Sequence, residues 1–541
     1  MVAAATRDLL PFTSLPLLLV ITFLTAILYA LRHHFFTGRN TAGLRLPPSP
    51  LALPFLGHLH LLAPLPHQAL HRLASRHGAP LLYLRLGSVP AIAACSPAAA
   101  REILKTHEPA FLDRPKPTAV HRLTYGGQDF SFSAYGPYWR FMKRACVHEL
   151  LAGRTLDRLR HVRREEVARL VASLRRSAAA GEAVDVNAVL MGLTGDVVSR
   201  MVMSRRWTGE DTDTEEMRAV VAETAELTGT FNLQDYIGVF KHWDVQGLGK
   251  RIDAVHRKFD AMMERILTAR DGERRRRREV AAGGEEGDKD VLDMLFDMHE
   301  DEAAEMRLTR DNIKAFMLDI FAAGTDTTTI TLEWALSELI NNPSVLRRAQ
   351  AELDAVVGAS RLADESDVPN LPYLQAITKE TLRLHPTGPL VVRRSMEPCK
   401  VSGYDVPAGA TVFVNVWAIG RDPASWGPDP VTFRPERFLD GEENAGLDVR
   451  GQHFHLLPFG SGRRICPGVG LAMLVVQAAL VAMVQCFEWT PVGGAPVDME
   501  EGPGLTLPRK KPLVCTFKAR FDTMPCLDAD GGGVVAGAAD E

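Results

Sequence analysis

The residues with the clearest chemical potential surround one cysteine, Cys466, within residues 458–468. Two arginines, Arg463 and Arg464, precede it, and an apolar run over residues 469–487 follows it and predicts a helix. A thiolate beside positive charge at a helix N-terminus has a lowered pKa and can serve as a permanent anionic ligand. The glycines of the stretch let the backbone approach a flat cofactor. The alternative interpretation is a buried structural cysteine.

A second candidate lies at the centre of a long predicted helix, residues 312–341, in a cluster of alanine, glycine, aspartate and threonine. An interior glycine costs about 1 kcal/mol relative to alanine, and threonine is a modest helix former. A sequence selected for helix stability alone would not contain this cluster. Gly324 permits close approach of a ligand, and the adjacent acid and hydroxyl of Asp326 and Thr327 suit a proton relay. The alternative is a threonine-rich helix that packs on polar neighbours.

Charged residues recur at helical spacing in two further places. Glu380 and Arg383 lie three residues apart on a helix that ends near Pro386, which alone predicts a surface ion pair worth less than about 1 kcal/mol. Trp139 and Lys143 lie four apart in a helix predicted to begin at residue 137, so both can reach a single anion. The alternative for this second pair is a surface cation–π contact.

The whole chain has the composition of a large folded protein. It contains 541 residues, of which 46% are hydrophobic, with a net charge of −4. This near-neutral balance argues against a general nucleic-acid binder. Seven scattered cysteines do not form a disulfide pattern, which favours a reducing compartment.

The N-terminal region predicts a membrane anchor. Residues 9–31 form a run of about 23 uncharged residues, long enough to span a bilayer as a helix, and basic residues follow it. By the positive-inside rule the rest of the protein faces the cytosol. We therefore expect an uncleaved anchor over residues 1–31, a basic and proline-rich hinge over 32–57, one catalytic domain over 58–518 and a disordered tail over 519–541.

Several connecting segments have predictable forms. Residues 81–95 and 401–416 each predict a β-hairpin with a Pro/Gly turn. Residues 231–238 interrupt a helical pattern and either line a substrate entrance or contact the membrane surface. The arginine run of residues 274–278 and the glycine- and glutamate-rich segment after it predict a solvated loop.

Together these motifs resemble those of the cytochromes P450. The haem-binding pattern Phe-x-x-Gly-x-Arg-x-Cys-x-Gly is matched by Phe459, Gly462, Arg464, Cys466 and Gly468. In that family the cysteine thiolate is the axial ligand of the haem iron. The residues from Ala323 to Thr328 are similar to the oxygen-activation motif of the same family, and the motifs occur in the family order.

The resemblance implies a mainly α fold with a small β subdomain, the cytochrome P450 fold, behind an N-terminal transmembrane anchor. It implies haem b, with Cys466 as the iron ligand, and electrons from NADPH delivered by NADPH–cytochrome P450 reductase. Asp326 and Thr327 would bind dioxygen with its water network and deliver protons. The other residues implied to bind the cofactor are Trp139, Lys143, Ala323, Gly324, Arg393, Phe459, Arg464 and Gly468.

The resemblance also assigns structural roles. Glu380, Arg383 and Arg437 would form a buried triad that supports the loop before the haem cysteine, and breaking such a triad is costly. Lys143 stands where the family usually has arginine, so bidentate geometry is lost while the charge is kept.

The plant group that contains flavone synthase II, flavanone 2-hydroxylase and isoflavone synthase is the most similar, and its grass members resemble the chain best. This favours hydroxylation of a flavanone such as naringenin at C-2, by a single-pass protein of the endoplasmic reticulum membrane. Flavonoid B-ring hydroxylation is the alternative within the oxygenases. A peroxide-consuming haem-thiolate isomerase or dehydratase and a non-catalytic haem carrier are the alternatives outside them. The predicted pocket residues are Phe130, Phe132, Phe321, Ala322, Leu390 and Val391.

Overall fold

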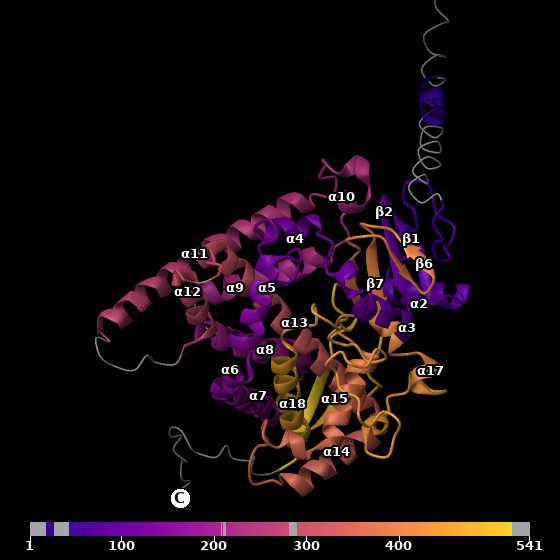
Figure 1. Cartoon of the computed structure of the whole chain (residues 1–541). Coiled ribbons are helices and arrows are strands. Elements are labelled where there is room, and N and C mark those ends of the chain that lie inside the picture. Colours follow the sequence, from indigo (N-terminus) through magenta and orange to yellow (C-terminus); the bar gives the residue numbers. More distant parts are fainter. Residues whose placement is uncertain are drawn as a thin grey trace, which may run out of the picture.

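The computed structural model describes residues 18–25, 43–206, 208, 212–280, 289–303 and 305–521, and most of them are helical (Figure 1). The helices of the first half are α2 (Pro66–His77), α3 (Pro97–Arg101), α4 (Thr118–Leu123), α5 (Pro137–Ala145), α6 (Gly153–Arg158), α7 (Arg160–Ala180), α8 (Val186–Met203), α9 (Thr212–Gly229), α10 (Leu233–Tyr236) and α11 (Leu248–Val280). Those of the second half are α12 (Val291–Glu300), α13 (Arg310–Asn341), α14 (Pro343–Val356), α15 (Pro372–Leu384), α16 (Val416–Ile419), α17 (Pro423–Trp426) and α18 (Val469–Cys486).

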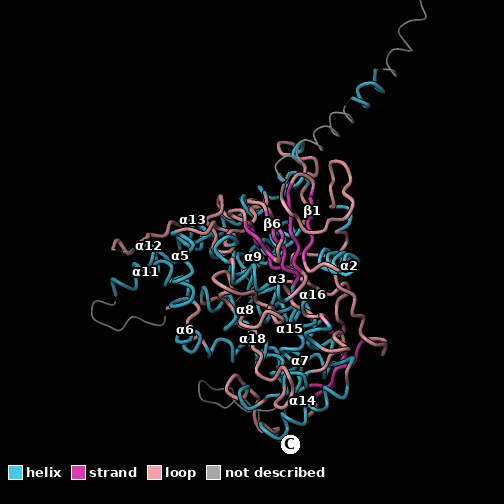
Figure 2. Tube along the Cα trace, turned by 45° about the vertical axis from the view of Figure 1, so that its right-hand side comes forward, coloured by secondary structure: helices cyan, strands magenta, loops and turns pink. Residues whose placement is uncertain are grey.

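The strands form three small sheets, and Figure 2 shows most of them gathered on one side of a helical body. The first sheet has the order β1-β2-β7-β4, and the others are β3-β9-β8 and β5-β6. The strands are β1 (Leu81–Leu86), β2 (Val89–Ala94), β3 (Val184–Asp185), β4 (Leu390–Arg394), β5 (Cys399–Val401), β6 (Tyr404–Val406), β7 (Thr411–Asn415), β8 (Phe487–Pro491) and β9 (Val514–Ala519). The fold is therefore mainly α with a small β portion, as predicted.

Helix α13 runs through the middle of the molecule (Figure 1). It begins with a capping box, in which the side chains of Thr309 and Asn312 bond each other's backbone N–H groups. It packs against α8, α15 and α18, and its C-terminal half belongs with α7, α8 and α18 to one apolar core. Its N-terminal half belongs to a second apolar core, with α5, α9, α11 and α12. Because both cores hold α13, residues at its centre are firmly positioned.

Several local predictions are confirmed. Strands β1 and β2 pair as an antiparallel hairpin, α5 begins at Pro137, α13 covers the predicted long helix, and α18 follows the cysteine loop. The predicted hairpin of residues 401–416 is wrong. Strand β6 pairs with β5, whereas β7 pairs in parallel with β2 and antiparallel with β4. At the turn between β6 and β7 the chain therefore passes from the β5-β6 sheet to the β1-β2-β7-β4 sheet.

The arginine run of residues 274–278 is also not a loop, because α11 continues through it to Val280. Arg274 is 7% exposed, and its guanidinium bonds Asp293, Asp297 and Glu300 on α12. These partners, far along the chain, neutralise a charge that local sequence predicts to be solvated. The glycine-rich residues 281–288 lie outside the described part.

Most of the predicted anchor and the C-terminal residues 522–541 also lie outside the described residues, and so these two predictions are not tested. Residues 18–25 are helical and exposed. Within the described chain, two helices are long and apolar enough to cross a membrane, α8 and α18. Both are 67% buried in the protein, as expected of core helices.

Candidate active site

The Cys466 loop is a tight turn that ends where α18 begins. The Cys466 N–H donates to the Phe459 carbonyl at 3.0 Å. Gly462 has a φ of +72°, and a side chain there would clash with the carboxylate of Glu108, so the position needs glycine. A Cβ at Gly468 would lie 3.7 Å from the Cys466 sulfur, so the backbone wraps the thiol closely.

The electrostatics of the thiol differ in one respect from the prediction. Burial raises the pKa of Cys466, although the Gly468 N–H and the charges of Lys143 and Arg114 lower it. The predicted net lowering is therefore wrong for the protein alone, because desolvation is the largest effect. The residue is nevertheless exposed on one side, and a cation bound at the sulfur favours the thiolate.

Two arginines beside the loop are buried without an acidic partner. Arg393 on β4 is 3% exposed and Arg464 is 5% exposed, and neither forms an ion pair with a carboxylate of the described residues. The Arg393 guanidinium donates only to carbonyls, those of Val392 at 3.0 Å and Arg464 at 3.4 Å. Burial and the nearby charges of Arg114 and Arg464 hold the pKa of Arg393 well below its usual value.

Two nitrogens of this cluster keep unused donors. Arg464 donates from Nε to the Leu112 carbonyl and from Nη2 to the Ser133 carbonyl, at 2.9 and 2.7 Å. Its Nη1 is buried without a partner in the described structure, as is Nε of Arg114. A buried donor without an acceptor costs about 1–3 kcal/mol, which a carboxylate ligand would recover. The cluster of Arg114, Arg393 and Arg464 is thus suited to bind an anion with several oxygens.

Helix α5 places the predicted pair on the same side as the cysteine loop. Trp139 is buried, and the Arg464 guanidinium lies over its ring at 4.4 Å from the centroid. Lys143 donates from Nζ to the Ile465 carbonyl at 3.1 Å, directly before Cys466. Burial is the main cause that lowers the pKa of Lys143, and the Arg114 and Arg464 charges add to it. The lysine therefore extends the positive cluster and anchors the loop as well.

Asp326 and Thr327 are both partly exposed at the centre of α13. The Thr327 hydroxyl donates to the Ala323 carbonyl at 2.7 Å, one turn earlier in the helix. Asp326 accepts a hydrogen bond on Oδ2 from the hydroxyl of Thr506, at 2.9 Å. Burial raises the pKa of Asp326. An acid whose pKa is raised by burial, beside a hydroxyl, holds its proton more readily than an exposed carboxyl and can pass it on.

The glycine in this motif has a packing role. A Cβ at Gly324 would lie 2.9 Å from a methyl group of Val198, so the glycine admits α8 against α13. The sequence predicted instead that Gly324 lets a ligand approach. Ala323 is exposed on its side of the helix and is better placed for that contact.

The three predicted structural residues do meet. Arg383 pairs with both carboxylate oxygens of Glu380, at 2.6 and 2.7 Å, and Arg437 lies 3.4 Å from the same carboxylate. All three are at least 95% buried. Both guanidinium groups also donate to backbone carbonyls of the segment that leads to the cysteine loop, namely those of Gly420, Pro430, Thr432, Trp426 and Asp429.

The predicted pocket residues divide into two groups. Phe321 is 0% exposed and Phe130 is 7% exposed, and both belong to the apolar core, where Phe130 stacks on Trp139. The structure packs both rings into this core, so their contact with a substrate stays a prediction. The partly exposed members remain candidates for substrate contact, namely Phe132, Ala322, Leu390 and Val391.

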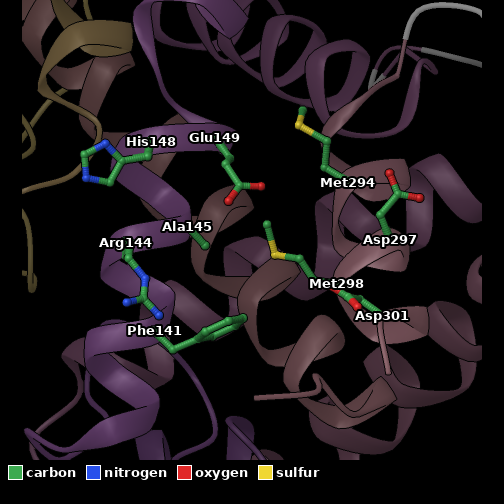
Figure 3. Close-up of a pocket in the computed structure, with 9 residues that line it drawn as sticks. All are labelled: Phe141, Arg144, Ala145, His148, Glu149, Met294, Asp297, Met298 and Asp301. Carbon is green, nitrogen blue, oxygen red and sulfur yellow. The ribbon is translucent and has the colours of Figure 1, made fainter. Parts of the chain in front are cut away.

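A separate surface pocket of about 550 Å³ lies between the α5 region and α12 (Figure 3). Its lining joins Phe141 and two methionines to acidic residues such as Glu149 and Asp301. It uses the face of α5 that carries Phe141 and Arg144, not the face with Trp139 and Lys143. The described residues also contain no cluster of three or more metal-ligating side chains, there or elsewhere. The chemistry-bearing residues therefore lie at the cysteine loop and α13.

Sequence reasoning missed three residues of the site. Arg114 completes the positive cluster, and Thr506 bonds Asp326 from a loop 180 residues away. Asp319, two turns before Asp326 on α13, accepts the backbone N–H groups of Phe130 and Ser131 at 2.8 and 3.0 Å. Of these, only Asp319 had a local signal, a carboxylate on the same helix face seven residues before the predicted acid.

Comparison with known proteins decides the family. The sequence pattern of the family "Cytochrome P450" matches residues 47–516. The chain is a cytochrome P450. A solved zebrafish cytochrome P450, in a structure with progesterone, matches with a TM-score of 0.71 and 27% identity, over 84% of this chain and 99% of the other.

Plant relatives are more similar in sequence. Cytochrome P450 93A3 from Glycine max is 51% identical, over 89% of this chain and 94% of the relative. The 3,9-dihydroxypterocarpan 6A-monooxygenase from the same plant is 50% identical, over 94% and 99%. The 2-hydroxyisoflavanone synthase from Glycyrrhiza uralensis is 42% identical, over 89% and 93%.

The cytochrome P450 is a monooxygenase that uses haem, with electrons that come from NADPH through a reductase. The residues present fit this cofactor. Cys466 offers the thiolate, and Arg114, Arg393 and Arg464 offer buried positive charge and unused donors to the propionates. When bound, a haem with a thiolate ligand activates dioxygen. The Asp326 carboxyl and the Thr327 hydroxyl, adjacent on α13, are the groups of this chain that could carry protons there.

Proposed function

We propose that this cytochrome P450 hydroxylates a flavanone such as naringenin at C-2. The net reaction consumes the flavanone, O₂, NADPH and one proton, and yields the 2-hydroxyflavanone, NADP⁺ and water. Loss of a second water from that product gives a flavone. Membership of the family establishes a monooxygenase, and the substrate and the position of hydroxylation are proposed in addition.

The observation that carries the proposal is the chemistry of the relatives. Their names place oxidation on a pterocarpan at position 6a and formation of a 2-hydroxyisoflavanone. Position 6a of a pterocarpan and C-2 of a flavanone are both saturated carbons of an oxygen heterocycle, and both are bonded to an aromatic ring. A pocket that presents such a carbon for oxidation binds a flat, rigid phenolic compound. The soybean pterocarpan enzyme makes position 6a of a pterocarpan the second candidate.

The partly exposed residues near the site suit a ligand of this shape. Leu390 and Val391 on β4 lie beside Arg393, so they are next to the cofactor-binding cluster. Phe132 lies in the loop that is tied to α13 through Asp319, and Arg114 lies over its ring at 5.6 Å from the centroid. Flat apolar side chains of this kind bind aromatic ligands well.

Turnover in yeast microsomes that contain a plant reductase tests the proposal. Naringenin, 3,9-dihydroxypterocarpan and NADPH are supplied, and products are separated by mass. We expect 2-hydroxynaringenin or apigenin, and we expect its loss in Cys466→Ala. A B-ring catechol or a 6a-hydroxypterocarpan would keep the mechanism and overturn the assignment to C-2.

Thr327→Ala separates the chemistry from substrate choice. If Asp326 and Thr327 deliver protons, this variant still binds substrate. The amount of product formed per NADPH consumed should fall by about 10-fold or more. The remaining electrons leave as hydrogen peroxide. Full coupling of NADPH to product in this variant would contradict the proposed relay.

We also propose that the protein is a single-pass protein of the endoplasmic reticulum membrane with a cytosolic catalytic domain. Exposed apolar residues support this, including Leu51, Phe55 and Trp243, which are 94%, 57% and 68% exposed. The two segments that carry them meet at the β1–β2 turn, where Gly87 donates to a carbonyl of the first and Ser88 to a carbonyl of the second. In Figure 1 both segments lie near the N-terminal end of the molecule.

Fractionation tests this placement. The full chain should remain with microsomes after a carbonate wash, and protease added outside the microsomes should digest the catalytic domain. A protein that the carbonate wash releases would contradict the anchor. Protection from protease would contradict the cytosolic orientation.

A further inference from the structure

The carboxyl of Asp326 is held from outside its own helix. Thr506 lies in the loop between β8 and β9, and its hydroxyl donates to Oδ2 of Asp326 at 2.9 Å. The neighbouring Thr327 hydroxyl does not serve this purpose, because it donates to the Ala323 carbonyl. The side chain that orients the acid therefore comes from a remote loop.

That loop is itself bound to α13 and to the segment between α15 and β4. The Trp334 indole N–H on α13 donates to the Leu507 carbonyl at 2.8 Å, and the Leu507 N–H donates to the Thr387 carbonyl at 3.0 Å. Leu507 is 0% exposed. With its neighbour secured in this way, Thr506 cannot drift from Asp326 without breaking two further hydrogen bonds.

The hydrogen bond also affects the charge of the acid. Burial raises the pKa of Asp326, and the Thr506 hydroxyl, which favours the carboxylate form, lowers it. No charged side chain of the described α8, α13 or β8–β9 loop contributes to this shift. The Thr506 hydroxyl is therefore the group that counteracts the effect of desolvation on the pKa of Asp326.

We propose that Thr506 is a positioning residue for proton delivery, which fixes the orientation of the Asp326 carboxyl through this hydrogen bond. The inference rests on Asp326 as the proton carrier and does not depend on the identity of the substrate. It predicts that the hydroxyl, rather than the shape of the residue, is what matters at position 506.

The same loop contacts the C-terminal end of α9. A Cβ at Gly229 would lie 2.9 Å from the Leu505 backbone nitrogen. Gly229→Ala would therefore push the loop at the residue before Thr506 and leave both members of the hydrogen bond chemically intact. This gives a second, independent way to disturb the orientation of Asp326.

The test compares Thr506→Val, which keeps the shape, with Thr506→Ser, which keeps the donor, in the full-length holoenzyme. Thr516→Val is the matched control, because Thr516 is half-buried on β9 and its hydroxyl also donates a hydrogen bond, to the Thr490 carbonyl. The first readout is an infrared titration of the Asp326 carboxyl, assigned by its absence in Asp326→Asn, which requires no substrate. The second is the share of NADPH recovered as product from naringenin, with peroxide as the remainder. A carbon monoxide difference spectrum establishes that each variant binds haem.

We expect Thr506→Val to move the titration upward by about one pH unit, the size of one lost hydrogen bond to a charged group. We expect coupling to fall about three- to tenfold, with Thr506→Ser and Thr516→Val close to wild type and Gly229→Ala between. An unchanged titration in Thr506→Val, or Thr506→Ser behaving like Thr506→Val, would overturn the inference alone. Unchanged coupling of NADPH to product in Asp326→Asn would overturn the role of Asp326, and the inference with it.

Discussion

Two groups of buried arginines in this protein differ in how their charge is compensated. Arg383 and Arg437 share the carboxylate of Glu380, and both guanidinium groups also donate to backbone carbonyls. Nε of Arg437 makes no hydrogen bond in the described structure, but it lies 3.4 Å from that carboxylate. Arg393 and Arg464 are equally buried, but within the described chain they form no ion pair with a carboxylate and donate only to backbone carbonyls. The Arg464 guanidinium also lies over the Trp139 ring.

The difference separates structure from binding. A buried guanidinium that faces a carboxylate already has its charge compensated, so its role is to hold together the segments that it bonds. A buried cluster of like charges with unused donors is destabilising in the protein alone and becomes favourable when an anion arrives. We therefore propose that the first cluster supports the cysteine loop and that the second would hold the haem propionates.

The largest expected effect comes from breaking the cluster of Glu380, Arg383 and Arg437. Glu380→Gln leaves the Arg383 charge buried and unpaired, which should lower the free energy of unfolding by about 3–5 kcal/mol. Thermal or urea unfolding of the purified protein measures this. Glu305→Gln is the control, because Glu305 pairs with Arg144 at the surface, with side chains 73% and 57% exposed, and should cost less than about 1 kcal/mol. Equal effects of the two variants would contradict a structural role for the triad.

Removal of a charge from the cluster of Arg114, Arg393 and Arg464 should have the opposite effect on stability. Arg393→Leu removes an uncompensated buried charge, so the haem-free protein should be as stable as wild type or more so. Haem affinity, measured by titration of the haem-free protein with hemin, should fall about 10- to 100-fold through the loss of one charge-assisted pair. Loss of stability without loss of haem affinity would assign Arg393 to the structural class.

Asp319 lies between these extremes, because it shares its surroundings with Arg114 and with a second acid. Burial, followed by the Asp129 carboxylate, raises the pKa of Asp319 to about 8. The folded state then keeps a proton that the unfolded chain releases at lower pH, so stability falls as pH rises toward 8. With a pKa of about 8 in the folded protein and about 3.9 in the unfolded chain, we expect a loss of about 3–4 kcal/mol between pH 5 and 8. Unfolding measured across this range should show it in wild type and not in Asp319→Asn, and an equal slope in both would contradict the assignment.

The smallest effect is expected at Lys143. Lys143→Arg keeps the charge and adds donors, so haem affinity should change by less than about threefold. Lys143→Met removes the charge and the hydrogen bond to the Ile465 carbonyl, and should weaken binding by about 10-fold. Hemin titration of both variants distinguishes charge from geometry, and equal losses would show that geometry dominates.

The sequence was sufficient where local patterns carry the information. The positions of Cys466, Asp326 and Thr327 follow from short motifs, and α5 and α13 from their caps and periodicity. The resemblance also predicted correctly that Glu380, Arg383 and Arg437 meet, which spacing alone did not.

The remainder depends on long-range contacts that no local pattern encodes. Thr506 reaches Asp326 across 180 residues, and Arg274 finds its acidic partners on another helix. Phe321 has the sequence position of a lining residue, yet its ring turns into the core. The direction of the pKa shift of Cys466 could not be predicted either, because it depends on the burial of the thiol, which only the folded chain shows.

The rate of haem transfer from the purified holoenzyme to apomyoglobin tests the central claim most directly. It is compared for wild type, Arg393→Leu and Glu305→Gln, with the unfolding free energy of each haem-free form measured in parallel. The account predicts about 10-fold faster haem loss in Arg393→Leu without a loss of stability, and wild-type behaviour in Glu305→Gln. Haem loss at the wild-type rate in Arg393→Leu would show that the cluster of Arg114, Arg393 and Arg464 does not hold the cofactor.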